Sequence, residues 1–263
     1  KPLCSKSVEP HNPCLREHMI LAGIMNVPVR AGSYRDSNYE EAVRLIHAAA
    51  GQGARLACTY EQFLDGYGFD GNKIPSIDDP NVERCEVIGD SVYVKGLAEL
   101  AGELEITIVA GVATQEGSGT YNSALVFGSN GHFLGHYRKT HNAGHYATWF
   151  APLSQDRKKA SCPSFDVGTG KVGIKICNDH HFSETTAYLI ENGCELLLCP
   201  SFGKYDPSRL LDDSADYGIW TVFVHPEGCQ FIHNGKVVRE QKAIEDRGSY
   251  ALHEVEFIKP IRR

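Results

Sequence analysis

Apolar runs of strand length alternate along the chain with segments in which apolar residues recur at helical spacing. The runs predict strands at residues 19–27, 55–60, 106–113, 121–128, 132–138, 164–167, 171–176, 195–200, 219–226 and 249–257, and a last hairpin at 229–240. The helical segments predict helices at 39–53, 91–103, 183–192 and 209–218. Strands that alternate with helices in this way are typical of an α/β layered fold with a mixed sheet.

Short polar signals predict where some of these elements begin and end. Ser37-Asn38 is expected to cap the first helix, and Gly51 and Gly53 are expected to end it. Asn130-Gly131 and Asn234-Gly235 each separate two strand-like runs, and Asn-Gly pairs favour tight hairpin turns. The pattern therefore predicts two hairpins among the alternating units.

Length, charge and cysteine spacing exclude several classes of protein. A chain of 263 residues can bury a large core, and no linker or repeat divides it, so we expect an N-terminal arm at 1–18 and one domain at 19–263. The formal net charge of −7 and the lack of a basic stripe argue against a nucleic-acid partner. No apolar stretch is long enough for a membrane helix, so no membrane partner is expected. The 9 cysteines lack the spacing of a disulfide framework, which favours the reducing cytoplasm.

Three chemically active side chains each follow a predicted strand: Glu61, Lys139 and Cys177. Ligands and catalytic groups of α/β sheets collect at strand ends. A thiol can act as a nucleophile, a carboxylate can take its proton and later activate water, and an ammonium can stabilise an oxyanion. Each residue alone also has an ordinary structural interpretation, as a buried cysteine, a glutamate that caps a loop, or a solvated lysine.

The sequences around these three residues resemble the signature regions of the carbon–nitrogen hydrolases, the nitrilase superfamily. The regions are YEQFLDGYGF (60–69), GHYRKTH (135–141) and VGIKICNDHHFSE (172–184), and their active residues follow the family order of glutamate, lysine and cysteine. The segments YNSALVFGSNGHFLGHYRKTH and NGCELLLCPSF also resemble strands of that family. Three motifs in order, with matching flanks, make this a specific resemblance.

The resemblance implies a four-layer αββα sandwich and usually a homodimer or a larger homo-oligomer. It implies hydrolysis of a small non-peptide amide, nitrile or N-carbamoyl bond through an acyl-enzyme, with no metal or other cofactor. Glu61 would be the general base and Cys177 the nucleophile. Lys139 and the backbone N–H of Asn178 would form the oxyanion site.

The closest resemblance within the superfamily is to N-carbamoyl-D-amino acid amidohydrolases, and the chain departs from their pattern in several places. His180 and His181 stand where that branch carries two arginines, and histidine cannot hold a substrate carboxylate by the same bidentate hydrogen bonds. A second glutamate of the family falls at Tyr146 here, and the region after the strand at 219–226 is shorter than usual. These departures leave the charge of the substrate open.

The substrate pocket is expected to draw on the residues around the three motifs. Its candidate residues are Tyr67, His141, His145, Tyr146, Asn178, His180, His181, Ser201 and Phe202. Asp179 and Glu184 match family positions that we interpret as structural. Cys177-x-x-His180 and the neighbouring histidines contain ligand types that suit zinc, but no paired CxxC or HExxH spacing is present, so no metal site is predicted.

Two functions from different classes fit the sequence. The first is a thiol-dependent amidohydrolase that acts on a small amide or carbamoyl compound, with a true nitrilase as a lesser variant. The second is a catalytically silent homologue that binds an amide-like metabolite or acts in assembly, and the absent second glutamate favours it. A hydrolase is expected to carry a low-pKa Cys177 thiol, tuned by Lys139 and Glu61, whereas a silent homologue is not.

Overall fold

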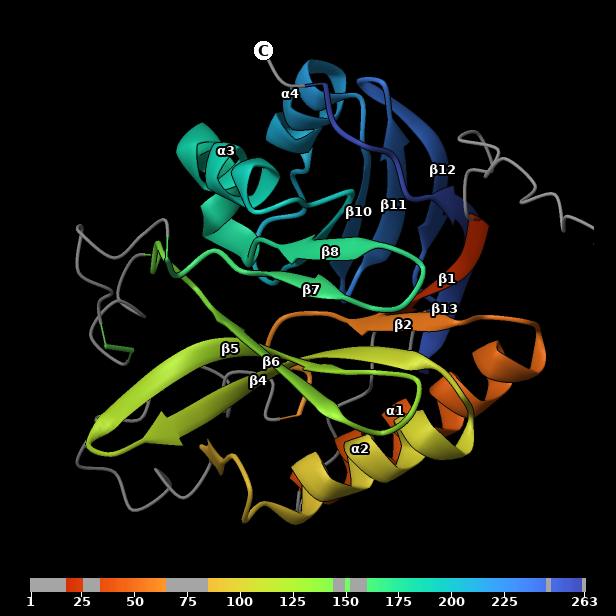
Figure 1. Cartoon of the computed structure of the whole chain (residues 1–263). Coiled ribbons are helices and arrows are strands. Elements are labelled where there is room, and N and C mark those ends of the chain that lie inside the picture. Colours follow the sequence, from red (N-terminus) through yellow and green to blue (C-terminus); the bar gives the residue numbers. More distant parts are fainter. Residues whose placement is uncertain are drawn as a thin grey trace, which may run out of the picture.

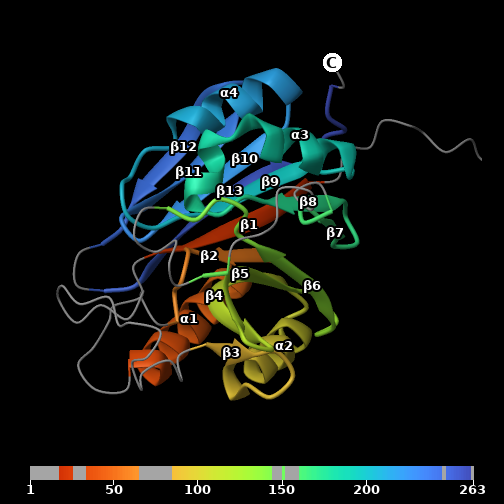
Figure 2. The same cartoon turned by 90° about the vertical axis from the view of Figure 1, so that its left-hand side faces the viewer.

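Two β-sheets face each other and carry helices on their outer faces (Figures 1 and 2). The computed structural model describes residues 18–25, 34–64, 85–143, 150–151, 160–244 and 247–261. Helices α1 (Tyr34–Gly51) and α2 (Val92–Glu103) cover the first sheet, and α3 (Ser183–Glu191) and α4 (Ser208–Tyr217) cover the second. The four-layer αββα sandwich is therefore confirmed.

The first sheet has the strand order β13–β1–β2–β4–β5–β6. Its strands are β1 (His18–Met25), β2 (Leu56–Thr59), β4 (Thr107–Glu116), β5 (Gly119–Phe127), β6 (Phe133–Arg138) and β13 (Ser249–Glu256), and the short β3 (Glu86–Val87) pairs with β4. Strands β2 and β4 are parallel, and β5 is antiparallel to both β4 and β6. Strand β6 therefore runs in the same direction as β2, so both strands end at the same edge of the sheet.

The second sheet has the strand order β12–β11–β10–β9–β8–β7. Its strands are β7 (Ser164–Asp166), β8 (Lys171–Ile174), β9 (Leu196–Pro200), β10 (Trp220–His225), β11 (Gly228–His233) and β12 (Lys236–Lys242). Strands β8, β9 and β10 are parallel. The segments after β8 and β9 therefore leave this sheet at one edge.

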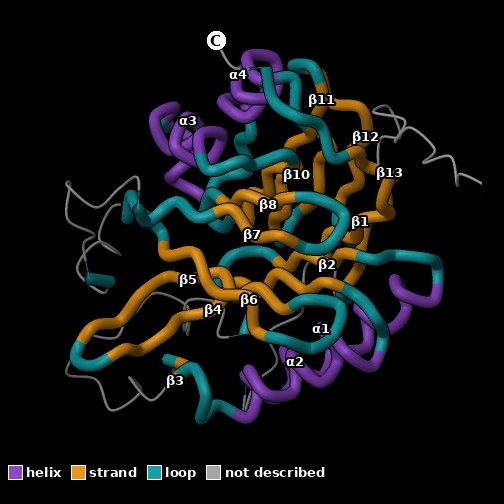
Figure 3. The backbone as a smooth tube through the Cα atoms, in the orientation of Figure 1, coloured by secondary structure: helices purple, strands orange, loops and turns teal. Residues whose placement is uncertain are grey.

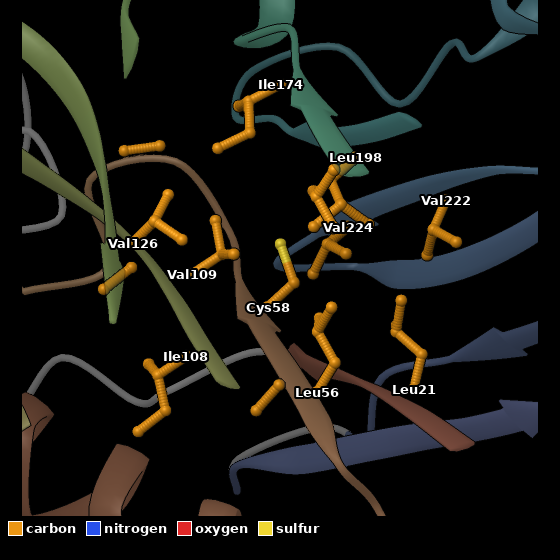
Figure 4. Packing of buried hydrophobic residues seen from close by; sticks show 14 of the residues in the cluster. Leu21, Leu56, Cys58, Ile108, Val109, Val126, Ile174, Leu198, Val222 and Val224 are labelled. Atoms are coloured by element: carbon orange, nitrogen blue, oxygen red, sulfur yellow. The ribbon is translucent and has the colours of Figure 1, made fainter. Parts of the chain in front are cut away.

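Buried apolar side chains fill the space between the two sheets (Figure 4). Cys58 of β2 points toward Leu198 of β9, and both side chains are fully buried. Gly23 allows the sheets to approach closely, because a Cβ at this position would lie 2.5 Å from Sγ of Cys229. Burial of this apolar surface stabilises the packing of the two sheets against each other.

Two local predictions differ from the structure, and one short strand was not predicted. Helix α1 begins at Tyr34, so the expected cap at Ser37-Asn38 is wrong; Asn38 is buried and its Nδ2 donates to the carbonyl oxygen of Leu64 over 2.9 Å. Strand β8 ends at Ile174 rather than directly before Cys177. The two-residue β3 was not predicted, because its pairing with β4 depends on tertiary contacts (Figure 3).

The expected division into an arm at 1–18 and one domain at 19–263 stays a prediction. Residues 1–17 of that arm lie outside the described residues, and His18 is the first residue of β1. The helices that the structure does describe include none with the length and apolar character needed to span a bilayer.

Candidate active site

Glu61 lies just beyond the carboxyl end of β2, which ends two residues before it. Its side chain is buried, with an exposed fraction of 1%. The chain bends across β4 here: the N–H of Phe63 donates to the carbonyl oxygen of Gly111 over 3.0 Å, and the N–H of Gly111 donates to Oγ1 of Thr59 over 2.9 Å. Only glycine suits position 111, because a Cβ would lie 2.5 Å from the carbonyl oxygen of Tyr60.

Lys139 and Asn122 both donate to the same carboxylate oxygen of Glu61. Nζ of Lys139 lies 2.6 Å from Oε1, and Nδ2 of Asn122 lies 2.7 Å from it. Asn122 belongs to β5, and its Oδ1 accepts a hydrogen bond of 2.9 Å from Nε2 of Gln62. The structure thus brings Glu61 and Lys139 together at one strand edge. Sequence reasoning missed Asn122, although an amide just before the apolar run of β5 is a signal.

Cys177 begins a 3₁₀ turn, Cys177–His181, that follows β8. Its φ of 45° lies in the left-handed region, which residues with a side chain seldom adopt. Its Sγ donates to the carbonyl oxygen of Phe202, just after β9, over 3.1 Å. Backbone conformations of this kind cost free energy and cluster at active sites.

Burial, Glu61 and Lys139 together set the ionisation of Cys177. Burial raises the pKa of the thiol, the charge of Glu61 raises it further and Lys139 lowers it, which gives a pKa of about 12. Burial lowers the pKa of Lys139, but the charges of Glu61 and Cys177 raise it by more, so the net shift is upward. The ammonium is therefore charged at neutral pH. The expected low-pKa thiol is therefore wrong, because with a pKa of about 12 the thiol of Cys177 is protonated at neutral pH.

Asp179 ties the nucleophile turn to the end of β6. Its buried carboxylate accepts hydrogen bonds from Oη of Tyr137 (2.7 Å), Oγ1 of Thr140 (2.9 Å) and the backbone N–H groups of His141 (2.7 Å) and Ile176 (3.0 Å). Burial raises the pKa of Asp179, but the His141 side chain, the charge of Lys139 and the hydrogen bonds from Ile176 and Tyr137 lower it more, so the net shift is downward. One carboxylate thus joins the two sheets beneath the site.

His141 and Asn178 have protein partners on several sides. The His141 ring stacks on Phe182 with centroids 3.6 Å apart, and its Nδ1 lies 3.2 Å from Oδ1 of Asp179. Its Nε2 lies 3.8 Å from Oε1 of Glu184. Nδ2 of Asn178 donates to the carbonyl oxygen of His141 over 3.1 Å. These contacts hold the turn in place, and a substrate contact for either residue stays a prediction.

His180 and His181 differ strongly in exposure. His180 is 6% exposed, whereas His181 is exposed, and their ring centroids lie 4.0 Å apart. Nδ1 of His180 is hydrogen-bonded to the carbonyl oxygen of Cys177. Burial and the neighbouring His181 lower the pKa of His180 to about 4. His180 is therefore neutral at physiological pH and offers no permanent charge to a substrate carboxylate.

Ser201 and Phe202 follow β9 on the second-sheet side of the site. Ser201 is buried, and Phe202 supplies the carbonyl oxygen that accepts from Cys177. His225 of β10, which the sequence did not single out, is bonded through Nε2 to the carbonyl oxygen of Gly203 over 3.1 Å. His225 therefore holds the loop that contacts the thiol.

Three candidate pocket residues lie outside the described residues: Tyr67, His145 and Tyr146. Tyr146 is also the position expected for the family's second glutamate. Their places in the pocket stay predictions. Within the described ranges, no three His, Cys, Asp or Glu side chains are grouped as a metal ion would require.

A buried ion pair lies directly behind the nucleophile turn. Lys175 is fully buried, and its Nζ donates to Oδ2 of Asp213 (2.9 Å), Oγ1 of Thr186 (2.6 Å) and the carbonyl oxygen of Phe182 (3.2 Å). These bonds join the end of β8 to α3 and α4. No sequence pattern predicts the pair, whose members are 38 positions apart.

Comparison with known proteins places this arrangement in a family. A family model described as carbon-nitrogen hydrolase matches residues 27–223. A nitrilase of Pyrococcus abyssi (strain GE5 / Orsay) is 33% identical over 226 residues, which cover 84% of this chain and 82% of that protein. Omega-amidase NIT2 of Homo sapiens is 30% identical over 179 residues, which cover 66% of this chain and 61% of that protein.

A solved structure shares the fold. The crystal structure of Saccharomyces cerevisiae Nit3, a member of branch 10 of the nitrilase superfamily, matches with a TM-score of 0.73 at 16% identity, over 91% of this chain and 90% of that one. Together the sandwich and the matched motifs define a hydrolase of the nitrilase superfamily. The chain belongs to the carbon-nitrogen hydrolase family. The finer resemblance to N-carbamoyl-D-amino acid amidohydrolases stays a prediction.

Proposed function

We propose that this protein hydrolyses the C–N bond of a small non-peptide amide or N-carbamoyl compound, with Cys177 as nucleophile. The observation that carries the proposal is the 2.6 Å contact between Lys139 and Glu61 at the sheet edge where the left-handed Cys177 lies. A buried ion pair and a strained backbone both cost free energy. Their coincidence at one place supports catalysis over a purely structural role.

In the acylation step, Sγ of Cys177 attacks the carbonyl carbon of the substrate. The thiol proton passes to Glu61 and then to the leaving nitrogen, which departs as ammonia or an amine. A C–S bond forms, the C–N bond breaks, and an acyl-enzyme thioester remains. The protonated resting thiol supports a general base in this step, because little thiolate exists before the substrate binds.

In the deacylation step, water attacks the thioester carbon. Glu61 takes a proton from the water and returns it to the sulfur of Cys177, and the acid product leaves. The oxyanion of each tetrahedral intermediate would be stabilised by the ammonium of Lys139 and by the backbone N–H of Asn178. The scheme uses no cofactor.

The neutral state of His180 supports an uncharged amide over a free amino-acid carboxylate as substrate. A buried neutral imidazole can exchange hydrogen bonds with a substrate but cannot replace the bidentate charge of an arginine. We assign His180 and the exposed His181 to the substrate side of the turn, with Ser201 and Phe202 opposite. Tyr67, His141, His145 and Tyr146 complete the proposed pocket.

A catalytically silent homologue is the second candidate. The tyrosine at position 146, where the family carries its second glutamate, favours this function. Such a protein would bind an amide-like metabolite or act as an assembly subunit, and its Cys177 would form no acyl adduct.

The test is a panel of small amides, ureido acids and nitriles incubated with the native protein, Cys177→Ala and Glu61→Gln. Intact mass would detect an acyl adduct, and ammonia release would measure turnover. We expect an adduct in the native protein that is absent from Cys177→Ala. Neither adduct nor ammonia from well-folded protein across the whole panel would contradict hydrolysis and support the silent homologue.

We further propose a cytoplasmic location and assembly as a homodimer or larger homo-oligomer. Reduced thiols at Cys58, Cys177, Cys194, Cys199 and Cys229 support a reducing compartment. Sedimentation velocity would test the assembly, and a monomer at micromolar concentration would contradict it.

A further inference from the structure

Three polar side chains form a fully buried chain beside the nucleophile. The exposed fractions of Glu61, Gln62 and Asn122 are 1%, 1% and 2%. Gln62 donates to Asn122, and Asn122 donates to Glu61. Buried polar groups cost free energy unless they are hydrogen-bonded, so three in sequence need a compensating arrangement or a function.

The direction of these hydrogen bonds is fixed by the charge of Glu61. An ionised carboxylate can only accept, so the amide of Asn122 must turn its Nδ2 toward Glu61 and its Oδ1 toward Gln62. Gln62 must then donate through Nε2, as it does over 2.9 Å. Both amide side chains thus turn their N–H donors toward the carboxylate of Glu61. Hydrogen bonds to the charged form of a group stabilise that form.

The backbone of Gln62 is also strained. Its φ of 56° lies in the left-handed region, although glutamine has no preference for that region. The strain places Gln62 against Asn122 while the preceding Glu61 reaches Lys139. Outliers of this kind persist where the surrounding structure requires them.

We propose that Asn122 is a positioning residue that holds the carboxylate of Glu61 through its hydrogen bond to Oε1 and so presents one defined oxygen to the reaction; this rests on the proposed function. Oε1 accepts from both Lys139 and Asn122, so Oε2 is the oxygen that takes the proton of Cys177. The proton moves from Sγ to Oε2 and then to the leaving nitrogen. Asn122 itself touches no reacting atom.

The charged and titratable groups around Glu61 in the described residues come from three elements. Lys139 follows β6, Cys177 begins the turn after β8, and His225 ends β10. Burial lowers the pKa of His225, and the charge of Glu61 acts in the opposite direction. Asn122 on β5 adds a neutral donor to this group. Its replacement changes the support of the carboxylate without removing any of these charges.

Asn122→Asp and Asn122→Leu are the two test variants. The aspartate is isosteric but brings a second carboxylate against Oε1, and the leucine removes the donor without adding a charge. We expect the acid limb of the kcat/KM profile to move upward, by about one pH unit for leucine and about two for aspartate. We expect kcat to fall roughly 10- to 100-fold with little change in KM.

Ser123→Ala is the matched control. Ser123 is the next residue of β5, is equally buried and bonds to Thr114 over 2.6 Å on the opposite face of the strand. This variant reports on the loss of a buried hydrogen bond in the same strand. It is expected to lower stability somewhat and to leave the pH profile unchanged.

A readout without turnover separates this inference from the proposed function. In protein carrying ¹³C-labelled glutamate, the carboxyl carbon of Glu61 can be assigned by its loss in Glu61→Gln. Its titration midpoint should rise in both Asn122 variants and not in Ser123→Ala. Shifted midpoints in a protein that turns over no substrate would support the role of Asn122 and reject hydrolysis. Unshifted midpoints would overturn the role of Asn122, whatever the activity.

Discussion

Nζ of Lys139 lies 2.6 Å from Oε1 of Glu61, so the ammonium that acts on the Cys177 thiol is itself paired with the carboxylate. Both side chains are buried, at 5% and 1% exposed, and solvent screens such a pair only weakly. Glu61 raises the pKa of the Cys177 thiol and Lys139 lowers it, and with burial the net shift is upward. In the proposed mechanism, the thiol would therefore lose its proton to Glu61 only when the substrate is bound.

This pairing predicts opposite effects of Glu61→Gln on two reactions of Cys177. The substitution removes the negative charge that raises the pKa of the thiol and leaves Lys139, which lowers it. Alkylation by iodoacetamide at pH 8 should therefore become faster, by about tenfold for each unit by which the pKa falls. Amide turnover should fall by roughly 10²- to 10⁴-fold, because the general base is lost.

Peptide mapping by mass spectrometry would follow Cys177 against the other thiols, several of which are fully buried. The matched comparison is Cys58, whose pKa is raised mainly by burial and which should stay unmodified in both proteins. Slower alkylation of Cys177 in Glu61→Gln than in the native protein would show that the carboxylate does not suppress the thiolate.

Gly111→Ala tests the close approach that places Glu61. The new Cβ would lie 2.5 Å from the carbonyl oxygen of Tyr60 and 3.0 Å from Cα of Glu61, and neither backbone atom can yield without moving the segment after β2. We expect a loss of about 1–3 kcal/mol in the free energy of unfolding. Turnover should fall by more than stability explains, since Glu61 shifts from Lys139.

Gly51→Ala is the control for this substitution. Gly51 ends α1, and a Cβ there would meet nothing within 4 Å. Its replacement should be neutral or slightly stabilising, because alanine reduces the freedom of the unfolded chain. Chemical denaturation and turnover of both variants would be measured together, and equal effects of the two would refute the close-approach argument.

Much of the fold follows from the apolar pattern, because strand and helix periods differ clearly along this chain. The positions of Glu61 and Lys139 at one edge also follow, since β2 and β6 run in the same direction. The antiparallel pairing of β13 with β1, in which His18 faces Glu256, does not follow. Nothing local in either strand specifies a partner so distant in the chain.

The site was predictable in its reactive residues and not in their support. In the sequence, Asn122 is one of two adjacent polar positions in a strand, and Lys175 is one of two lysines in the predicted strand 171–176. Their partners become apparent only when the chain is folded. The protonation of Cys177 was mispredicted for the same reason, because it depends on whether Lys139 lies nearer to the thiol or to Glu61.

The pair of Lys175 and Asp213 predicts non-additive effects on stability. Burial raises the pKa of Asp213 in spite of the ammonium beside it, so ionising it in this place costs free energy. Lys175→Met or Asp213→Leu alone should cost about 3–5 kcal/mol in the free energy of unfolding, because each leaves a buried charge without its partner. The double variant should lose less than the sum of the two.

Urea denaturation of the four proteins would give this coupling directly. Arg209 and Asp212 of α4 provide a control pair, exposed at 64% and 68% with atoms 3.6 Å apart, whose removal should cost little. Simple additivity of Lys175→Met and Asp213→Leu would contradict a coupled pair behind the nucleophile turn.

Asp179→Asn should change how stability depends on pH. The folded-state pKa of Asp179 lies below its ordinary value of 3.8, so its ionised carboxylate contributes stability above that value, and the contribution is lost as pH falls through the folded value. At pH 7 the variant should be less stable by about 1.5–3 kcal/mol, because hydrogen bonds from Tyr137 and Ile176 lose a charged acceptor. The deficit should shrink as pH falls below 3.8. Urea denaturation between pH 3 and 7 would measure it, with the exposed Asp166→Asn as control, and a deficit independent of pH would show that the charge of Asp179 does not hold the two sheets together at the nucleophile turn.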